Sequence, residues 1–407
     1  MKCRHCGHVG GHPVIDLGHA PPSNAYLSRD DLKKPEITYP LAVKVCGNCF
    51  LVQTEDYAKA DELFTSDYAY FSSTSKSWLD HAAHYAKNIS ARLSLGPQSL
   101  VIEVASNDGY LLRNFVDAKI PCLGIEPTAS TAAAAEKLGI PVLHKFFGQD
   151  LAKQLVADDK QADLVCGNNV YAHVPDINDF TSGLATVLKP QGVVTLEFPH
   201  LLNLIRLCQF DTIYHEHYSY LSLAVVQRIF AKAGLRLFDV EELETHGGSL
   251  RIYGCRQDAK HIRTENVQRI LIAEQTAGLE SVETYSSFQS RAEKIKLNFL
   301  SFLIDAKQRG KKVVAYGAAA KGNTLLNFAG VKPDLLPVVF DAATAKQGKL
   351  MPGSHIPILP PDALAKSTAD YVVILPWNIA AEVMERTKAL VAARARYVVA
   401  VPELKIL

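Results

Sequence analysis

The chain has 407 residues, of which 48% are hydrophobic and 21% charged, and its net charge is +1. This composition predicts a globular protein of two or three domains. It excludes nucleic-acid binding through a strongly basic surface. Because no run of about 18 apolar residues occurs, it also excludes a membrane span. The N-terminal segment MKCRHCGHVG lacks the apolar core of a signal peptide, so we expect a cytoplasmic protein.

The N-terminal segment carries two CxxC pairs, CRHC and CGNC. Each pair brings two thiolates to one ion from a tight turn, and two pairs complete the tetrahedral shell of a structural zinc site. A disulfide or a redox pair is the alternative, but two pairs this close in the chain favour zinc. We expect strands and loops between the pairs, and a segment that needs its metal to fold. The predicted zinc ligands are Cys3, Cys6, Cys46 and Cys49.

The stretch QSLVIEVASNDGYLLRNF predicts a buried strand, a turn of small residues and a helix. The next predicted strand, CLGIEPT, ends at Glu126. This order is typical of the first half of a Rossmann-like sheet, and Glu126 would accept hydrogen bonds from ribose hydroxyls. The dinucleotide fingerprint GxGxxG is absent, and Glu103 lies within the first strand. A pyrophosphate is disfavoured there and a sulfonium is not, so we predict S-adenosylmethionine rather than NAD. The alternative is a Rossmann-like fold without a working site.

Polar residues follow two further predicted strands of this unit. ADLVCGNNVYAHVPD ends in Asn168, Asn169 and His173, and GVVTLEFPHL ends near Glu197. Ligands of open α/β sheets lie beyond the carboxyl ends of the strands, where these side chains fall. Phe146 or Phe147 could cover an adenine or belong to the core. The residues predicted to bind S-adenosylmethionine are Glu103, Ser106, Asn107, Gly109, Glu126, Phe147 and Asn168.

The segment YHEHY, residues 214–218, concentrates groups suited to proton transfer. Histidine titrates near neutral pH and can act as a general base. A carboxylate can orient that base, and a tyrosine hydroxyl can donate a hydrogen bond to a developing negative charge. One alternative is a metal site of two histidines and a carboxylate. The other is a polar turn before the helix SLAVVQRIFAKAGL, with Ser222 as its N-cap. We expect structural roles for His215 and Tyr218.

From about residue 266 the chain begins a new unit. SFQSRAEKIKLNFLSFLIDAKQRG predicts a long amphipathic helix, and KKVVAYGAAAKGNTLLN repeats the strand, glycine turn and helix. A helix N-terminus with Lys321 beside it suits an anion such as a pyrophosphate. The alternative is a packing domain whose glycines serve only tight turns. Upstream, Gly247 and Gly248 of THGGSLR permit close backbone approach.

These patterns predict an α/β protein with three parts: a small N-terminal zinc module, a central Rossmann-like methyltransferase domain and a second Rossmann-like C-terminal domain. We place their limits at residues 1–65, 66–265 and 266–407.

Several motifs together, in this order, resemble the sugar C-methyltransferases of deoxysugar biosynthesis, the nucleotide-sugar C-3-methyltransferases. The motifs are CRHC…CGNC, EVASNDGYLL, NNVYAHVPD, FDTIYHEHYSYLS, THGGSLR and AYGAAAKGNTLLN. The resemblance implies S-adenosylmethionine-dependent methylation at C3 of a nucleotide-linked, dTDP-type 4-keto-6-deoxysugar, and a monomer. It implies catalytic roles for Tyr68, His173, Tyr214, Glu216 and His217, with His217 as the base. Substrate contacts are expected from Tyr70, Tyr316, Gly317, Lys321, Asn323, Trp377 and Asn378.

Two other functions compete with this one. An NAD-dependent sugar epimerase or dehydrogenase predicts GxGxxG and a YxxxK pair, and neither stands in its expected place. A zinc-bearing protein that binds a nucleotide sugar without turning it over would not need Glu216 and His217 beside a methyl donor.

Overall fold

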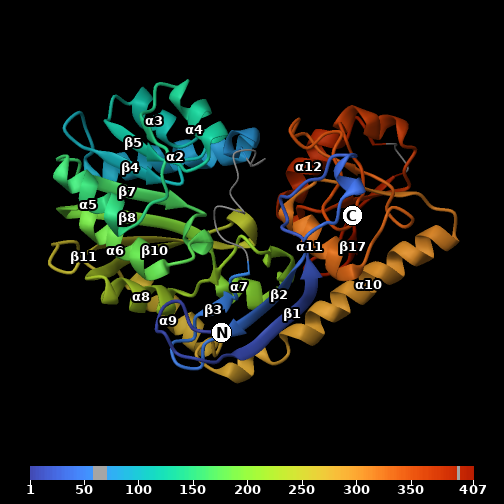
Figure 1. Cartoon of the computed structure of the whole chain (residues 1–407), viewed down its shortest axis with the longest axis horizontal. Helices are drawn as coiled ribbons and strands as arrows, with labels where there is room; N and C mark the ends of the chain where they lie inside the picture. The colour runs from blue at the N-terminus through green and yellow to red at the C-terminus, as the bar shows by residue number, and fades with distance from the viewer. Residues whose placement is uncertain (58–70, 392–394) are drawn as a thin grey trace.

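The computed structural model describes residues 1–57, 71–391 and 395–407 (Figure 1). Three sheets of seven, six and four strands organise these residues. The two larger sheets stand side by side, and the four-stranded sheet lies below them in Figure 1, near the long helix α10, Phe288–Gln308. The predicted α/β class, with two Rossmann-like units and a small N-terminal module, is confirmed.

The seven-stranded sheet belongs to the central unit and has the order β10-β11-β8-β7-β4-β5-β6. The strands from β8 to β6 pair in parallel, whereas β11 pairs antiparallel with both β8 and β10. The carboxyl ends of the parallel strands therefore share one edge. The strands span β4 Val101–Val104, β5 Cys122–Ile125, β6 Val142–Leu143, β7 Ala162–Asn168, β8 Leu188–Pro199, β10 Leu235–Leu243 and β11 Ser249–Arg256.

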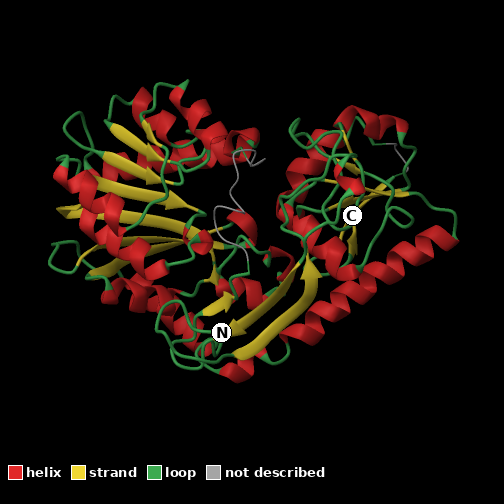
Figure 2. Cartoon of the chain, viewed as in Figure 1, coloured by secondary structure: helices red, strands yellow, loops and turns green. Residues whose placement is uncertain are grey.

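Helices cover both faces of this sheet (Figure 2). The reason is the alternation of strand side chains, which point to opposite faces: Val101 and Leu164 join one buried cluster, and Ile102 and Val165 join another. The first cluster contains α2 Lys76–Leu93, α3 Leu112–Asp117 and α4 Ala129–Glu136. The second contains α5 Gln149–Ala157, α6 Ile177–Val187, α8 Leu223–Lys232 and α9 Glu265–Thr276.

The six-stranded sheet forms the C-terminal unit, in the order β14-β13-β12-β15-β16-β17. All its pairs are parallel except β16 with β17. Helix α10 buries one stripe of side chains at helical spacing, which confirms the predicted amphipathic helix. The elements span β12 Val313–Tyr316, α11 Ala320–Ala329, β13 Val339–Phe340, β14 Ile358–Leu359, β15 Tyr371–Ile374, α12 Ala380–Thr387, β16 Arg396–Val399 and β17 Lys405–Ile406.

The four-stranded antiparallel sheet combines the N-terminal module with a strand from the middle of the chain. β1 His12–Ala20, β2 Tyr39–Val45 and β3 Val52–Thr54 come from the module, and β9 Ser219–Tyr220 completes the sheet. Because β9 directly follows YHEHY, pairing of β3 with β9 fixes that segment against the N-terminal module.

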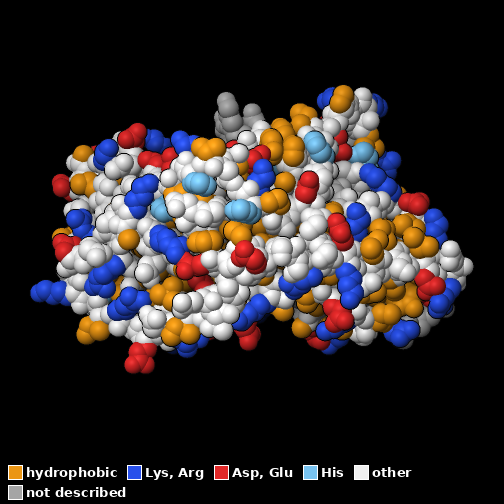
Figure 3. Space-filling view, turned by 90° about the horizontal axis from the view of Figure 1, so that it is seen from below, with side chains coloured by type: hydrophobic (Ala, Val, Ile, Leu, Met, Phe, Trp, Pro, Cys, Tyr) orange, Lys and Arg blue, Asp and Glu red, His pale blue; other side chains and the backbone are white. Residues whose placement is uncertain are grey.

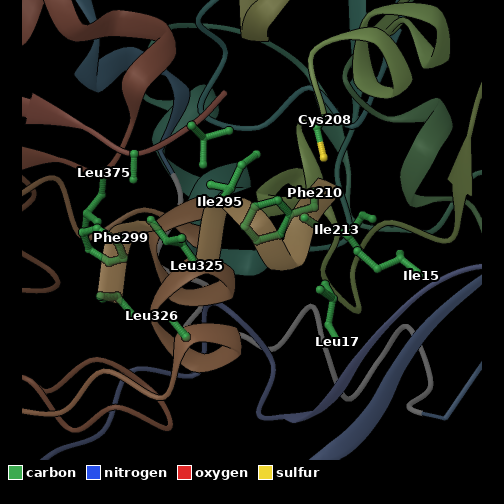
Figure 4. Packing of buried hydrophobic residues seen from close by; sticks show 14 of the residues in the cluster. Ile15, Leu17, Cys208, Phe210, Ile213, Ile295, Phe299, Leu325, Leu326 and Leu375 are labelled. Atoms are coloured by element: carbon green, nitrogen blue, oxygen red, sulfur yellow. The ribbon is translucent and has the colours of Figure 1, made fainter. Parts of the chain in front are cut away.

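One buried cluster crosses the limits predicted for the three domains (Figure 4). It packs Ile15 and Leu17 of β1 and Phe210 and Ile213 against residues of α10 and α11, such as Phe299. Helix α7, Leu201–Arg206, contributes to the same cluster. The predicted limits at residues 65 and 265 stay a prediction.

Within the described ranges no helix combines the length and the apolar character that a membrane span requires. Acidic and basic side chains alternate over the face seen in Figure 3, as the small net charge suggests.

Candidate active site

The four N-terminal cysteines form one compact cluster. All four Sγ atoms lie within 4.8 Å of one another, with 3.5 Å between Cys3 and Cys49 and 3.6 Å between Cys6 and Cys46. These separations exclude a disulfide bond and match the edge of roughly 3.8 Å of a tetrahedron with Zn–S bonds of about 2.3 Å. A hydrogen bond from Cys49 lowers the pKa of Cys3 to about 4. The donor set therefore fits zinc.

The first glycine turn, residues 105–109 between β4 and α3, is surrounded by carboxylates. Glu103 is fully buried, and burial raises its pKa well above the usual value, with Asp108 and Glu126 adding to the effect. Among the described residues, Ser106 Oγ and Asn168 Nδ2 are buried without a hydrogen-bond partner. Acidic side chains beside unused polar atoms fit a ligand that carries a cation and hydroxyls, as S-adenosylmethionine does.

Glu126 fixes the shape of this turn. One carboxylate oxygen accepts a hydrogen bond from the N–H of Asn107 and the other from the N–H of Thr128, each at 2.9 Å. Each oxygen keeps a second lone pair for a ribose hydroxyl. Gly109 has a φ of +79°, and a Cβ there would lie 2.5 Å from Ile140 Cδ1. Glycine is therefore needed for packing against the core, in addition to any closeness to a ligand.

The two phenylalanines proposed to cover an adenine differ in their surroundings. Phe146 is 52% exposed. Phe147 is half-buried and lies edge-on to Phe180, with 5.4 Å between ring centroids. Phe147 is thus the one that combines a fixed position with an accessible surface.

YHEHY folds into a tight turn that brings three predicted catalytic residues together. The N–H of His217 donates to the carbonyl of Tyr214 at 2.9 Å, which places the two rings 3.9 Å apart. His173, which follows β7, lies edge-on to His217 with 4.5 Å between centroids. In an extended strand the side chains of Tyr214 and His217 would point to opposite faces. Here they face the same side, because the backbone turns between them.

Backbone carbonyls orient both histidines. His217 Nδ1 lies 2.8 Å from the carbonyl of Thr212, and His173 Nδ1 lies 2.8 Å from the carbonyl of Glu216. Because a carbonyl only accepts, each Nδ1 carries the proton and each Nε2 carries the lone pair. Burial lowers the pKa of His173 to about 4 and that of His217 well below its usual value. Both imidazoles are therefore neutral at neutral pH, and they titrate below the near-neutral range expected from the sequence.

Nδ1 of His217 donates to the carbonyl of Thr212 and not to the carboxylate expected from the sequence, that of Glu216. Glu216 Oε1 accepts a hydrogen bond from Asn24 Nδ2 at 3.1 Å, in the loop after β1, and burial raises the pKa of Glu216. Asn24 is a residue that sequence reasoning missed. The only available signal was the turn-forming stretch PPSN, which does not reveal a partner 192 positions away.

The remaining residues of YHEHY, His215 and Tyr218, are both buried. His215 Nε2 lies 3.2 Å from the carbonyl of Pro40 on β2. Ser222 begins α8, and its hydroxyl accepts a hydrogen bond from the N–H of Val225.

Lys321 is the cation of the second glycine turn, residues 317–319 between β12 and α11. Its Nζ donates to Asn378 Oδ1 at 3.1 Å and lies 4.8 Å from the ring centroid of Trp377. Burial lowers its pKa to about 8, and its charge in turn helps to lower the pKa of His217. Trp377 Nε1 donates to Asp211 at 2.6 Å. Three predicted substrate residues, Lys321, Trp377 and Asn378, therefore form one group near the histidines.

The other predicted substrate residues of this unit are more deeply enclosed. Asn323 is fully buried, and its Nδ2 donates to the carbonyl of Ser23 at 2.7 Å. Tyr316 is buried, and Gly317 has a φ of +91° with Pro376 closely packed against it. The N–H of Ala318 donates to Asp341 at 2.6 Å, so this amide is already occupied by a carboxylate.

His246 of THGGSLR lies between the two large units. Its Nε2 is 2.9 Å from Asn169 Nδ2 beyond β7, and its carbonyl accepts a hydrogen bond from Lys321 at 3.4 Å. Its ring lies edge-on to Trp78, which stacks on His81. The sequence did not single out Trp78 and His81, because both lie in an ordinary helix. Tyr68 and Tyr70, predicted for the active site, lie outside the described residues.

Comparisons with known proteins cover the whole chain. Residues 3–64 match a family model described as "Putative zinc binding domain", residues 78–240 "Methyltransferase domain" and residues 244–402 "C-methyltransferase C-terminal domain". The C-methyltransferase NovU of Streptomyces niveus is 32% identical over 406 residues, which cover 100% of this chain and 96% of NovU. The chain belongs to the C-methyltransferase family.

This C-methyltransferase has narrower similarity to other proteins. An uncharacterized methyltransferase of Mycobacterium leprae is 29% identical over 99 residues, 24% of this chain and 36% of that protein. Among solved structures, the magnesium protoporphyrin IX methyltransferase of Synechocystis aligns with 44% of this chain and 77% of its own at 15% identity and a TM-score of 0.33. A methyltransferase of Clostridium acetobutylicum aligns with 44% and 92% at 10% identity and a TM-score of 0.36.

Family membership confirms the enzyme class and both predicted cofactors. The protein is an S-adenosylmethionine-dependent C-methyltransferase with a zinc-binding domain built on four cysteines.

Proposed function

We propose that this C-methyltransferase methylates C3 of a nucleotide-linked 4-keto-6-deoxysugar, with dTDP as the expected nucleotide. The support is its similarity over the full length to NovU, together with the resemblance of its motifs to sugar C-methyltransferases. We also propose that it acts as a monomer in the cytoplasm, and that its domains span residues 1–65, 66–265 and 266–407.

The observation that carries this proposal is the pair of neutral histidines, His173 and His217, beside Tyr214. A carbon next to a ketone is a weak acid, and a neutral imidazole is a suitable proton acceptor. The Nε2 of His217 takes the proton from C3, and the electron pair of that C–H bond forms the enolate. The carbonyl of Thr212, which holds Nδ1–H, then stabilises the imidazolium.

Other residues of the group serve the developing negative charge and the two ligands. In the proposal, Tyr214 donates a hydrogen bond to the enolate oxygen, and the ammonium of Lys321 adds a favourable charge. Glu216, held by Asn24, closes the pocket as a carboxyl whose pKa is raised. When bound, S-adenosylmethionine supplies an electrophilic methyl group for the C3 carbon.

The ligand-binding assignments rest on the two glycine turns together with the resemblance of the motifs to sugar C-methyltransferases. The first turn, with its carboxylates, suits the methyl donor, and the group around Lys321 suits the anionic nucleotide sugar. The residues assigned to S-adenosylmethionine are Glu103, Ser106, Asn107, Gly109, Glu126, Phe147 and Asn168. The residues assigned to the nucleotide sugar are Tyr70, Tyr316, Gly317, Lys321, Asn323, Trp377 and Asn378.

A panel of nucleotide-linked sugars tests the proposal. The purified protein is incubated with S-adenosylmethionine and each of several 4-ketosugars, with the matching 4-hydroxy sugars as controls, and products are analysed by mass spectrometry and NMR. We expect a mass gain of one methyl group, located at C3, only with a 4-ketosugar. Methylation of the 4-hydroxy controls, or methylation at oxygen, contradicts the proposal.

A further inference from the structure

Arg4 stands inside the first zinc knuckle, between Cys3 and Cys6, and its guanidinium bridges two distant segments. One nitrogen donates to the carbonyl of Pro175 at 2.9 Å, and another donates to the carbonyl of Thr54 at 2.8 Å. The guanidinium carbon lies 5.3 Å from the ring centroid of Tyr218. The side chain is only 7% exposed, and the nitrogen that donates to Thr54 also forms an ion pair with Asp56 at 2.8 Å.

The residues that the Arg4 guanidinium contacts are connected to the two histidines. Pro175 lies two residues after His173, and Tyr218 adjoins His217. Thr54 connects further, because its N–H donates to the carbonyl of Tyr218 and its hydroxyl to the carbonyl of His217, both at 3.2 Å.

The backbone of Arg4 is itself fixed by the module and by helix α6. Its N–H donates to Gln53 Oε1 at 3.1 Å, and its carbonyl accepts a hydrogen bond from Asn178 at 3.0 Å. The flanking cysteines belong to the four-cysteine cluster, which fits zinc. The metal would therefore determine where the guanidinium stands.

We propose that Arg4 is a positioning residue that sets the spacing of His173 and His217, so that the zinc module acts on catalysis through this side chain. The inference rests on the proposed function, because it assumes that the histidines do the chemistry. A planar guanidinium reaches two carbonyls at once, whereas a lysine ammonium on a flexible stem does not hold the same two directions. Displacement of a reacting group by about 1 Å can cost roughly 100-fold in rate.

The test compares Arg4→Gln and Arg4→Lys with a matched control, Arg228→Gln. Arg228 donates to the carbonyl of Cys49 at the second knuckle at 3.0 Å, and among the described residues its other side-chain hydrogen bond is to Glu280. The measurements are kcat, the KM of both substrates, the pH profile of kcat, zinc content and thermal unfolding.

We expect Arg4→Gln to lower kcat about 10- to 100-fold, with both KM values within about threefold of wild type and zinc retained. Arg4→Lys should recover only part of the loss, and Arg228→Gln should keep wild-type kcat. In Arg4→Gln, the acid-side fall of kcat should shift to a higher pH, because water that reaches the histidines raises their pKa. If Arg4→Gln loses zinc or does not fold, Thr54→Val removes one link of the same path and should lower kcat with zinc in place.

An Arg4→Gln enzyme with kcat within twofold of wild type overturns the inference, as does an equal loss in Arg228→Gln. In the fallback arm, an unchanged kcat in Thr54→Val overturns it. Failure of the proposed function has a separate signature: wild-type protein that methylates no 4-ketosugar, or full turnover by His217→Asn.

Discussion

The two glycine turns have nearly the same local structure and different electrostatic surroundings. Each follows a buried parallel strand and precedes a helix, β4 and α3 in one case and β12 and α11 in the other. At the first turn Glu126 approaches from the neighbouring strand, and Glu103 adds a second buried carboxylate. At the second, Asp341 accepts a hydrogen bond from the N–H of Ala318, and Lys321 adds a buried ammonium that interacts electrostatically with Asp211.

This difference shows that the strand–turn–helix pattern specifies a place for a ligand, while residues from elsewhere specify its charge. A turn whose charged neighbours are carboxyl groups suits a sulfonium and an ammonium, whereas a turn that adds a buried ammonium suits an anion. The histidine pair lies near the second turn, since the charge of Lys321 helps to lower the pKa of His217. The following substitutions distinguish the role of the base from the roles of the two binding regions, and they are given in order of decreasing expected effect.

His217→Asn should have the largest effect, a fall in kcat of about 1,000-fold, because general-base catalysis contributes roughly 100- to 10,000-fold. Affinities for both ligands, measured by calorimetry, should stay within threefold. His215→Asn is the matched control: it lies two residues away, is held by the carbonyl of Pro40, and should keep wild-type turnover. Equal losses in the two variants would remove the special role of His217.

Glu126→Ala should weaken the first turn alone. Hydrogen bonds to a charged group contribute about 1.5–3 kcal/mol, so we expect the affinity for S-adenosylmethionine to fall about 10- to 100-fold. Nucleotide-sugar affinity should not change. Equal weakening of both ligands would show that Glu126 supports the fold rather than the donor site.

Lys321→Met should have the converse effect. We expect an approximately tenfold higher KM for the nucleotide sugar and an unchanged affinity for S-adenosylmethionine. The pKa of Lys321 near 8 adds a pH dependence, because the ammonium loses its proton as pH rises through that value. Wild-type kcat/KM should therefore decline above about pH 8, and Lys321→Arg should abolish that decline. An alkaline limb that persists in Lys321→Arg would assign it to another group.

His173 should make the smallest contribution, visible in stability rather than in binding. Its pKa is lowered to about 4 in the folded protein, from 6.5. The unfolded chain therefore binds the proton first, and the free energy of unfolding falls as pH falls from about 6.5 to 4, by at most roughly 1.4 kcal/mol per pH unit. Urea unfolding of His173→Gln at several pH values, with zinc content followed in parallel, should give a shallower slope than wild type. Identical slopes contradict the assignment.

The sequence predicted the elements whose signals are local. The CxxC spacing located the zinc cluster, and apolar runs followed by small-residue turns located both Rossmann-like units. Contacts between distant segments could not be read in this way. Nothing in the sequence near His217 indicates that its ring is oriented by the carbonyl of Thr212. In the same way, no local pattern indicates that Asn24 donates a hydrogen bond to Glu216, or that the N–H of Ala318 donates one to Asp341. Each of these depends on how the backbone turns and on which segment packs beside it.

Hydrogen exchange at C3 of the sugar tests the central claim most directly. The nucleotide-linked 4-ketosugar is incubated in D₂O with enzyme and S-adenosylhomocysteine, so that no methyl transfer follows, and loss of the C3 proton signal is measured by NMR against an enzyme-free control. We predict that the wild-type enzyme exchanges this proton above the background rate and that His217→Asn does not. Exchange by His217→Asn at the wild-type rate would contradict the account.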